Sequence, residues 1–199
     1  MVMMSTEHDF SPGSYQYAWL ERDLANVDRT LTPWVLVAGH RPMYVSQNTW
    51  PADNAVAHNL ERLLEDLLYK YKVDMAFWAH YHSYERTCKL YKYECVGDGI
   101  VHILVGTAGR SADPREWDNN TWSVYRNTEY GYGRVSVANR TSLLYEFVSN
   151  YNKEVRDRFW LHRTDPEKMS PLSSTSFKES DQEKVLPMVF LLFCFINAV

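Results

Sequence analysis

The sequence predicts a layered α/β fold that becomes rich in β-strands in its second half. Apolar runs of strand length alternate with segments of helical periodicity up to residue 79, an order that is typical of α/β folds. Short strand-like segments separated by turns follow residue 99. The chain has 199 residues, 45% of them hydrophobic and 15% aromatic, which is enough to bury one sizeable core and too apolar for a disordered protein.

The first half contains three predicted strands and two predicted helices. Residues 1–4 form a short apolar strand-like run, which we interpret as a core strand entered from a missing upstream segment. Residues 34–38 and 73–79 are unbroken apolar runs, as in strands buried on both faces. Helical spacing covers 15–28 and about 55–71. One face of each helix is apolar, formed by Tyr17, Leu20, Leu24 and Val27 in the first, and by Leu60, Leu63, Leu64, Leu67, Leu68 and Tyr71 in the second.

The second half is predicted to be an antiparallel sheet. Its strand-like segments are 100–105, 132–138, 142–149 and 155–161, and hairpin-sized connections separate the last three.

Charge and cysteine usage narrow the class of protein. The formal net charge of -4 provides no basic surface for nucleic acid, so we expect no nucleic-acid partner. Cys88 and Cys95 flank a short polar stretch, as in a hairpin loop closed by a disulfide, and no second pair completes a zinc site. Sequons at Asn119 and Asn139 predict glycosylation. Together these features favour a secreted or lumenal protein.

The C-terminal end differs in composition from the rest. Residues 163–184 are predicted to be a polar, Ser-rich linker, and residues 185–199 an apolar tail. The tail is short for a bilayer span, which needs about 20 residues. Its pattern is typical of a lipid-anchor signal, and the alternative is a hydrophobic end with no anchoring role. Membrane contact is expected only through this tail, and the oligomeric state stays open.

Three histidines follow two consecutive buried strands. His40 comes after the strand at 34–38, and His80 and His82 come after the strand at 73–79. Ligands bind at the carboxyl ends of the strands in open α/β sheets, and neutral imidazole binds zinc, iron and manganese-class metals. If residues 80–82 are extended, His80 and His82 project in the same general direction. The spacing therefore predicts a metal site, although each histidine could instead be a polar residue at a sheet edge.

The residues around these histidines resemble a known family. Residues 37–44 (Val-Ala-Gly-His-Arg-Pro-Met-Tyr) and 79–86 (Ala-His-Tyr-His-Ser-Tyr-Glu-Arg) are similar to the VxxH and GHxH metal motifs of purple acid phosphatases. Residues 69–74, 107–109 and 131–133 also fit the family. The resemblance covers about residues 1–162, which would be the C-terminal part of a metallophosphoesterase domain.

The resemblance implies a calcineurin-like metallophosphoesterase fold, a β-sandwich flanked by helices. It implies acid-phosphatase hydrolysis of phosphate monoesters by two metals, iron with a second divalent ion (zinc, iron or manganese). His40 and His80 would bind the divalent metal and His82 the ferric iron. Tyr84, Glu85 and Arg86, which come after His82 in the sequence, would position the loop that carries the histidines.

The carboxylate half of the family's site is missing from the sequence. The family's DxG, GDxxY and GNH(D/E) motifs do not occur, and Gly97-Asp98 lacks the tyrosine of GDxxY. Ala79 replaces the glycine of GHxH, and Trp50-Pro51 lies where some plant members carry a substrate-contacting histidine. Three neutral imidazoles cannot offset the charge of two cations at close range. We therefore expect a truncated form that alone binds one divalent metal weakly or not at all.

Two other functions remain open from the sequence. One is a non-catalytic descendant of the fold that acts as a binding or regulatory protein. The other is a nucleotide pyrophosphatase/phosphodiesterase, which would use the same metals on phosphate diesters.

Overall fold

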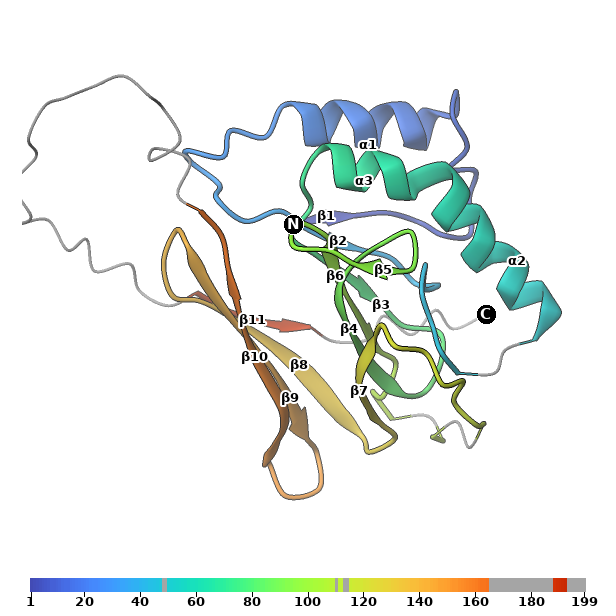
Figure 1. Cartoon of the computed structure of the whole chain (residues 1–199), viewed down its shortest axis with the longest axis vertical. Helices are drawn as coiled ribbons and strands as arrows, with labels where there is room; N and C mark the ends of the chain where they lie inside the picture. The colour runs from blue at the N-terminus through green and yellow to red at the C-terminus, as the bar shows by residue number, and fades with distance from the viewer. Residues whose placement is uncertain (48–49, 110, 113–114, 165–187, 193–199) are drawn as a thin grey trace, which may run out of the picture.

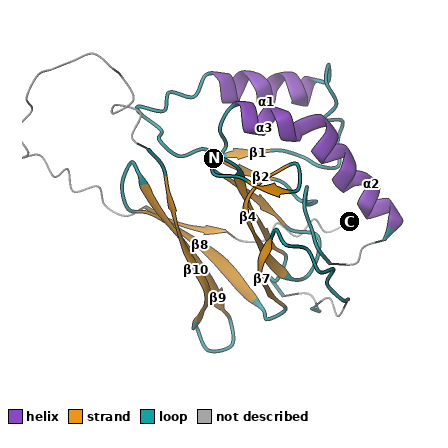
Figure 2. Ribbon diagram, viewed as in Figure 1, coloured by secondary structure: helices purple, strands orange, loops and turns teal. Residues whose placement is uncertain are grey.

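The protein is built from three layers, which are visible in Figure 1 and Figure 2. The computed structural model describes residues 1–47, 50–109, 111–112, 115–164 and 188–192, the last five by their backbone only. Helices cover one face of a seven-stranded sheet, and a four-stranded sheet packs on its other face. One hydrophobic cluster fills the space between helices and sheet, and a second fills the space between the sheets. The predicted β-sandwich flanked by helices is thus confirmed.

The larger sheet combines a parallel and an antiparallel part. Its path is β1 (Val2–Met3), β2 (Leu36–Ala38), β3 (Met75–Trp78), β6 (Ile100–Val105), β4 (Tyr84–Tyr91) and β5 (Glu94–Cys95), and β7 (Ser123–Asn127) pairs with β4. The strands β1, β2, β3 and β6 run parallel, whereas β4 is antiparallel to its neighbours. The parallel strands β2, β3 and β6 are buried on both faces, which explains their unbroken apolar sequences. The sequence pattern did not predict β4, β5 or β7, because charged residues interrupt β4 and β7 and β5 has only two residues.

The helices lie close to the predicted positions. α1 (Tyr15–Ala25) begins where the Ser14 side chain accepts a hydrogen bond from the Tyr17 amide, and it buries Leu20 and Leu24. The second predicted helix is a continuous run of α2 (Pro51–Leu60), a π-helical turn η1 (Glu61–Glu65) and α3 (Asp66–Lys70). It starts four residues before the predicted residue 55, because Pro51 suits the first turn of a helix, where no amide donor is needed. No helix in the described part of the chain combines the length and apolar character needed to cross a membrane.

The smaller sheet is antiparallel, as predicted for the second half. The strand predicted at 100–105, however, is β6 of the larger sheet, where it runs parallel to β3. Its order is β10 (Val155–His162), β9 (Ser142–Ser149), β8 (Gly131–Val137) and β11 (Met188–Leu192). The predicted linker at 163–184 lies outside the described residues apart from its first two positions. Of the apolar tail, only 188–192 is described, and these residues pair with β8 as the edge strand β11.

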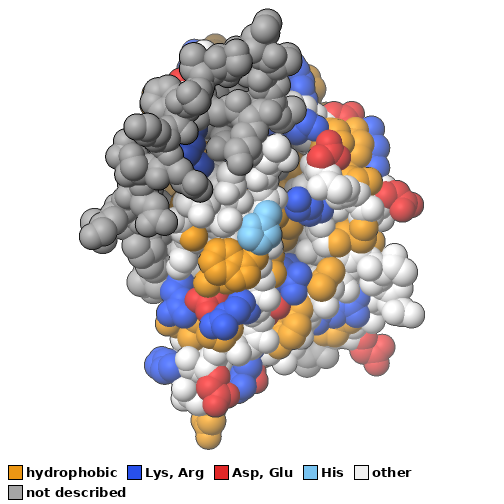
Figure 3. All heavy atoms as spheres, turned by 60° about the vertical axis from the view of Figure 1, so that its left-hand side comes forward, with side chains coloured by type: hydrophobic (Ala, Val, Ile, Leu, Met, Phe, Trp, Pro, Cys, Tyr) orange, Lys and Arg blue, Asp and Glu red, His pale blue; other side chains and the backbone are white. Residues whose placement is uncertain are grey.

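The outer face of the smaller sheet carries a network of ion pairs. Glu146 on β9 lies opposite Arg134 on β8 and Arg158 on β10. Its carboxylate forms ion pairs with both arginines, at 2.7 and 2.6 Å. Figure 3 shows a face on which basic, acidic and hydrophobic side chains are intermingled. The inner face of this sheet is apolar. Burial alternates along β8, whereas β9 is buried continuously from Tyr145 to Ser149.

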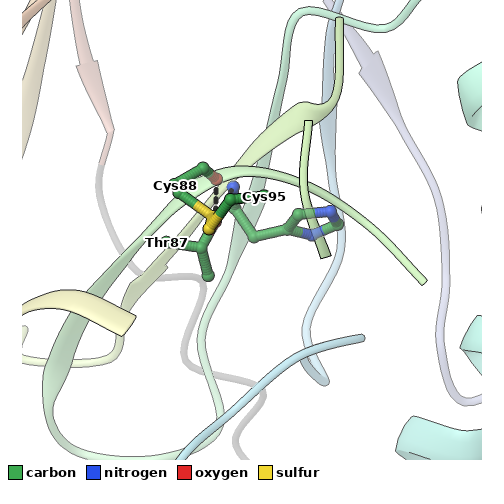
Figure 4. The surroundings of a disulfide bond; sticks show 4 residues. Thr87, Cys88 and Cys95 are labelled. Atoms are coloured by element: carbon green, nitrogen blue, oxygen red, sulfur yellow. Dashed lines mark hydrogen bonds between the residues drawn. A yellow bond between two sulfur atoms is a disulfide. The ribbon is translucent and has the colours of Figure 1, made fainter. Parts of the chain in front are cut away.

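A disulfide closes the hairpin between β4 and β5, as the sequence predicted. Cys88 and Cys95 are bonded, with 5.8 Å between their Cα atoms (Figure 4). Thr87 beside it accepts a hydrogen bond from the His102 amide of β6 at 2.9 Å. The bond therefore holds an edge hairpin that is also attached to the core strand β6.

Replacing both Cys88 and Cys95 with alanine should reduce the free energy of unfolding by about 2.5 kcal/mol, because a crosslink over this short loop restricts the unfolded chain. Urea unfolding of the oxidised protein and the double variant measures this difference. A reducing agent should lower the stability of the original protein by a similar amount and leave the variant unchanged. Equal stability of the two oxidised proteins would contradict the expectation.

Candidate metal site

The carboxyl ends of β2 and β3 bring His40 and His80 into contact. The Nε2 atom of His40 lies 3.2 Å from Nδ1 of His80, and the rings meet edge to face. Hydrogen bonding continues beyond both strands. The Gly39 amide donates to the Phe77 carbonyl at 3.0 Å, and the Ala79 amide donates to the His40 carbonyl at 2.8 Å. The parallel register of two neighbouring strands thus fixes the backbone positions of both histidines.

Gly39 allows the end of β2 to lie close to the Trp78 ring. A Cβ atom at this position would lie 2.8 Å from the Trp78 ring and 3.1 Å from the Thr6 side chain. The absence of a side chain lets the end of β2 pack directly on the Trp78 indole. The indole is in turn held by a hydrogen bond to Nδ1 of the buried His102, at 3.0 Å.

His80 occupies a tight turn, which corrects the extended conformation assumed from the sequence. Its φ angle is 67°, in the left-handed region, and the Tyr81 amide donates to the Ala79 carbonyl at 2.8 Å. This is a three-residue γ-turn with His80 at its centre. Such a conformation costs about 1–3 kcal/mol and persists only where surrounding contacts impose it. The alternation of side chains along a strand therefore does not make His80 and His82 project in the same direction.

His82 has its own backbone partner. Its Nδ1 lies 3.0 Å from the carbonyl oxygen of Ser111. Because a carbonyl oxygen can only accept, Nδ1 carries the proton and the lone pair of neutral His82 is on Nε2. His82 is also close enough to His40 for its charge to lower the pKa of His40. All three predicted histidines thus lie at one end of the sheet, and His40 and His80 are in direct contact.

The surroundings of both contacting imidazoles favour the neutral form. Burial lowers the pKa of His40 below its ordinary value of 6.5, and the charge of His80 lowers it further. Burial and then the nearby Arg41 guanidinium lower the pKa of His80 in the same way. Neutral imidazole is the form that binds a metal, so the lowered pKa of each ring reduces the competition between protons and a metal.

The His40–His80 pair fits one divalent metal ion. Two nitrogens each about 2.1 Å from one metal, at tetrahedral or octahedral angles, are about 3.0–3.4 Å apart, and the observed separation is 3.2 Å. The other ring nitrogen of His40, Nδ1, is buried without a hydrogen-bond partner. However, no group of three or more His, Cys, Asp or Glu side chains in the described ranges is arranged to hold a metal. The described residues therefore supply two ligands for a divalent ion and no carboxylate that could bridge it to a second one.

An ionic network beside the histidines was not predicted from the sequence. Arg41 joins two carboxylates: its Nε lies 2.8 Å from Glu7, and its Nη1 lies 2.5 Å from Asp53. Asp53 also lies 3.2 Å from Nε2 of His80. The available signal was Pro51 followed by an acidic residue, which is typical of the first turn of a helix.

Glu85 on β4 binds the segment that follows the His40 motif. Its carboxylate is buried and accepts hydrogen bonds from the amide and hydroxyl of Ser46 and from the Ser123 hydroxyl. Arg126 forms an ion pair with it at 3.7 Å. Glu85 thereby ties the segment after the His40 motif to β4 and β7.

Tyr84 and Arg86 face the opposite way, into the space between the two sheets. Tyr84 donates to the Asp157 carboxylate on β10 at 2.7 Å, and Arg86 donates to it at 2.6 and 2.9 Å. The Arg86 guanidinium also lies over the Phe159 ring, 4.7 Å from its centroid. These two residues anchor the strand that follows His82 to the second sheet. Their role in positioning the histidines stays a prediction.

The remaining predicted site residues lie on the surface. Asn119 and Asn139 are exposed, and the Asn139 side chain accepts hydrogen bonds from the amide and hydroxyl of Thr141 in its own sequon. Asp98, from the incomplete Gly-Asp motif, forms an exposed ion pair with Lys72 at 2.8 Å. It therefore does not contribute to the histidine cluster. Glycosylation of the two asparagines stays a prediction.

Family models match the two halves of the domain separately. Residues 3–84 match the family described as calcineurin-like phosphoesterase. Residues 99–158 match the family described as iron/zinc purple acid phosphatase-like protein C. Residues 85–98, which contain most of β4 and all of β5, lie between the two matches.

Individual proteins support the same assignment. The chain is 36% identical to probable inactive purple acid phosphatase 27 of Arabidopsis thaliana, over 79% of this chain and 28% of that protein. It is 33% identical to the nucleotide pyrophosphatase/phosphodiesterase of Hordeum vulgare, over 79% and 46% of the respective chains, and 37% identical to mouse acid phosphatase type 7, over 74% and 39%. The chain spans less than half the length of these curated relatives.

A solved structure shows the same fold. Purple acid phosphatase PPD1 from yellow lupin seeds superimposes with a TM-score of 0.74 at 29% identity, and the match covers 88% of this chain and 34% of the lupin chain. The fold, the motifs around His40 and His80, and the two family matches therefore agree. The chain belongs to the purple acid phosphatase family of calcineurin-like phosphoesterases and corresponds to the C-terminal part of these proteins.

Proposed function

We propose that this chain carries the histidine half of a two-metal site that hydrolyses phosphate monoesters, once carboxylate ligands complete it. The observation that carries the proposal is the contact of 3.2 Å between Nε2 of His40 and Nδ1 of His80 at the ends of adjacent parallel strands. A divalent metal held there supplies Lewis-acid activation of the phosphate ester and of the attacking water. His82, whose free nitrogen is Nε2, would serve the neighbouring iron position.

The residues around the histidines have structural tasks in this proposal. Arg41 is held between Glu7 and Asp53, so it fixes the end of β2 and is not free to bind phosphate. Glu85 and Arg86 hold the strand after His82 against the segment at Ser46 and against the second sheet. The proposed substrate is a phosphate ester, and no role in the reaction falls to nucleic acid.

Alone, the 199-residue chain should show little or no turnover. Neutral imidazoles do not offset the repulsion between two cations that a bridging carboxylate would reduce. The names of several similar Arabidopsis proteins, among them probable inactive purple acid phosphatases 27 and 24, are consistent with a non-catalytic member, which is the main alternative. The barley relative's name supports phosphate diesters as the alternative substrate class.

A chimera tests the proposal directly. Residues 1–162 of this chain would replace the matching C-terminal region of the barley relative, which then supplies the upstream part. We expect metal-dependent hydrolysis of p-nitrophenyl phosphate that His40→Ala or His80→Ala abolishes. The matched control is His58→Ala, because His58 is exposed on α2 and its loss should leave the rate unchanged.

The same assay separates the alternatives. Preference for bis(p-nitrophenyl) phosphate would favour the phosphodiesterase function. A folded chimera with no hydrolysis of either compound would favour the non-catalytic function. Robust turnover by the isolated chain, sensitive to His40→Ala, would overturn the expectation that the histidine half is inactive alone.

We also propose that the protein enters the secretory pathway. The Cys88–Cys95 disulfide and the exposed sequon asparagines Asn119 and Asn139 support an oxidising, lumenal environment. Attachment of a lipid at the apolar tail stays a prediction from the sequence.

A further inference from the structure

The His80 ring lies between two partners, one at each nitrogen. Nδ1 faces Nε2 of His40 at 3.2 Å, and Nε2 faces Oδ1 of Asp53, also at 3.2 Å. Asp53 comes from the first turn of α2, and its side chain is only 16% exposed. In neutral imidazole one nitrogen carries the proton and the other the lone pair, and neighbouring groups decide which. The orientation of His80 thus depends on the groups around Nε2.

We infer that Asp53 is a positioning residue that keeps the proton on Nε2 of His80, so that the lone pair on Nδ1 points at His40. A carboxylate only accepts hydrogen bonds. A protonated Nε2 would therefore be attracted to Oδ1, whereas a lone pair there would be repelled by it. A carboxylate that holds a histidine through its second nitrogen is a general way of orienting a ligand towards a metal.

Arg41 is the competing neighbour. Its Nη1 lies 3.3 Å from the same Nε2 atom of His80. If Arg41 donated to Nε2, the proton of the neutral ring would move to Nδ1, and the ring would present an N–H group to His40. The two neighbours therefore demand opposite tautomers of His80.

The geometry favours Asp53 over Arg41 as the hydrogen-bond partner of Nε2 of His80. Nη1 of Arg41 is 2.5 Å from Oδ1 of Asp53 but 3.3 Å from Nε2 of His80, so the contact with the carboxylate is the shorter of the two. Nε of Arg41 donates to Glu7 at 2.8 Å, and the Arg41 amide donates to the Thr6 hydroxyl at 3.0 Å. Hydrogen bonds to an ionised carboxylate are about twice as strong as neutral ones. Arg41 therefore holds Asp53 in place, and Asp53 in turn holds His80.

In this arrangement His80 and His82, the two histidines of the second motif, carry their lone pairs on different ring nitrogens. His82 donates from Nδ1 to Ser111 and keeps its lone pair on Nε2. His80 donates from Nε2 to Asp53 and keeps its lone pair on Nδ1. The inference rests on the proposed function only in its last step, that the Nδ1 lone pair serves a metal. The tautomer itself follows from the contacts of the ring.

Nuclear magnetic resonance of the 199-residue chain tests the inference without any assay of activity. Long-range proton–nitrogen correlation at about pH 8, where the imidazoles are neutral, reports which nitrogen of His80 is protonated. We expect predominantly Nε2–H in the original protein and a shift to predominantly Nδ1–H in Asp53→Ala, because Arg41 then donates to Nε2. Arg41→Ala should keep Nε2–H.

The matched carboxylate control is Asp98→Ala, which removes an exposed aspartate bound to Lys72 and should not change the His80 tautomer. Predominant Nδ1–H in the original protein would overturn the inference, even if Asp53→Ala did not fold. An unchanged tautomer in a folded Asp53→Ala variant would overturn it as well. Failure of the chimera to hydrolyse phosphate esters would leave this measurement unaffected, so the two proposals fail separately.

Discussion

Replacing Asp157 with alanine should lower the free energy of unfolding by about 3–5 kcal/mol, the range for removing one partner of a buried ion pair. The Arg86 and Asp157 side chains are 14% and 5% exposed, and the carboxylate accepts three hydrogen bonds from Arg86 and Tyr84. Its loss would leave a guanidinium and a phenol hydroxyl without this acceptor between the sheets. Urea unfolding of the variant and the original protein measures the difference.

Asp98→Ala is the control for this experiment. Asp98 also forms an ion pair, but both side chains of that pair are 58% exposed, and exposed pairs contribute about 0–1 kcal/mol. If Asp157→Ala cost no more than Asp98→Ala, the contact between the sheets would not stabilise the fold in the way proposed here. Arg86 and Tyr84 lie on the strand that follows His82. Asp157→Ala should therefore also loosen the turn from His80 to Ser83.

Gly106→Ala should have the second-largest effect, about 3 kcal/mol of lost stability, the upper part of the usual range for overpacking. Gly106 directly follows β6, and its amide donates to the Ser83 carbonyl at 3.0 Å. A Cβ atom there would lie 1.7 Å from the backbone oxygen of Tyr81. A backbone atom cannot rotate away as a side chain can, so the turn from His80 to Ser83 would have to move. Urea unfolding measures the stability, and the imidazole resonances of His80 and His82 report the movement.

Gly97→Ala is the matched control, because no atom lies within 4 Å of a Cβ atom built at this exposed glycine. It should change stability by no more than about 0.5 kcal/mol and leave the histidine resonances in place. If Gly106→Ala behaved like Gly97→Ala in both measurements, the close approach of β6 to the histidine turn would not constrain it.

Local sequence patterns were sufficient for much of the fold. The apolar runs at 34–38 and 73–79 predicted β2 and β3, because strands buried on both faces need continuous apolar side chains. The leucine stripe after residue 55 predicted the long helix, and the polar stretch between Cys88 and Cys95 predicted the closed hairpin. The strand β4 was missed because arginine, lysine and glutamate interrupt its pattern. Glu85 and Arg86 bind Ser46, Ser123 and Asp157, which lie far along the chain, where no local rule can find them.

The candidate site also has one part that the sequence predicted and one part that it did not. The sequence by itself determined that His40 and His80 follow neighbouring strands, and the parallel register then brings them together. Only the tertiary structure decided which groups hold them: Asp53 is 27 residues from His80 in the chain, and Asp157 is 71 residues from Arg86. It also decided that His80 occupies a γ-turn and not an extended segment. The physical reason is that the periodicity of a strand or helix depends on residues that are close in the sequence. The partner of a carboxylate depends instead on which elements pack against each other, and periodicity does not specify that.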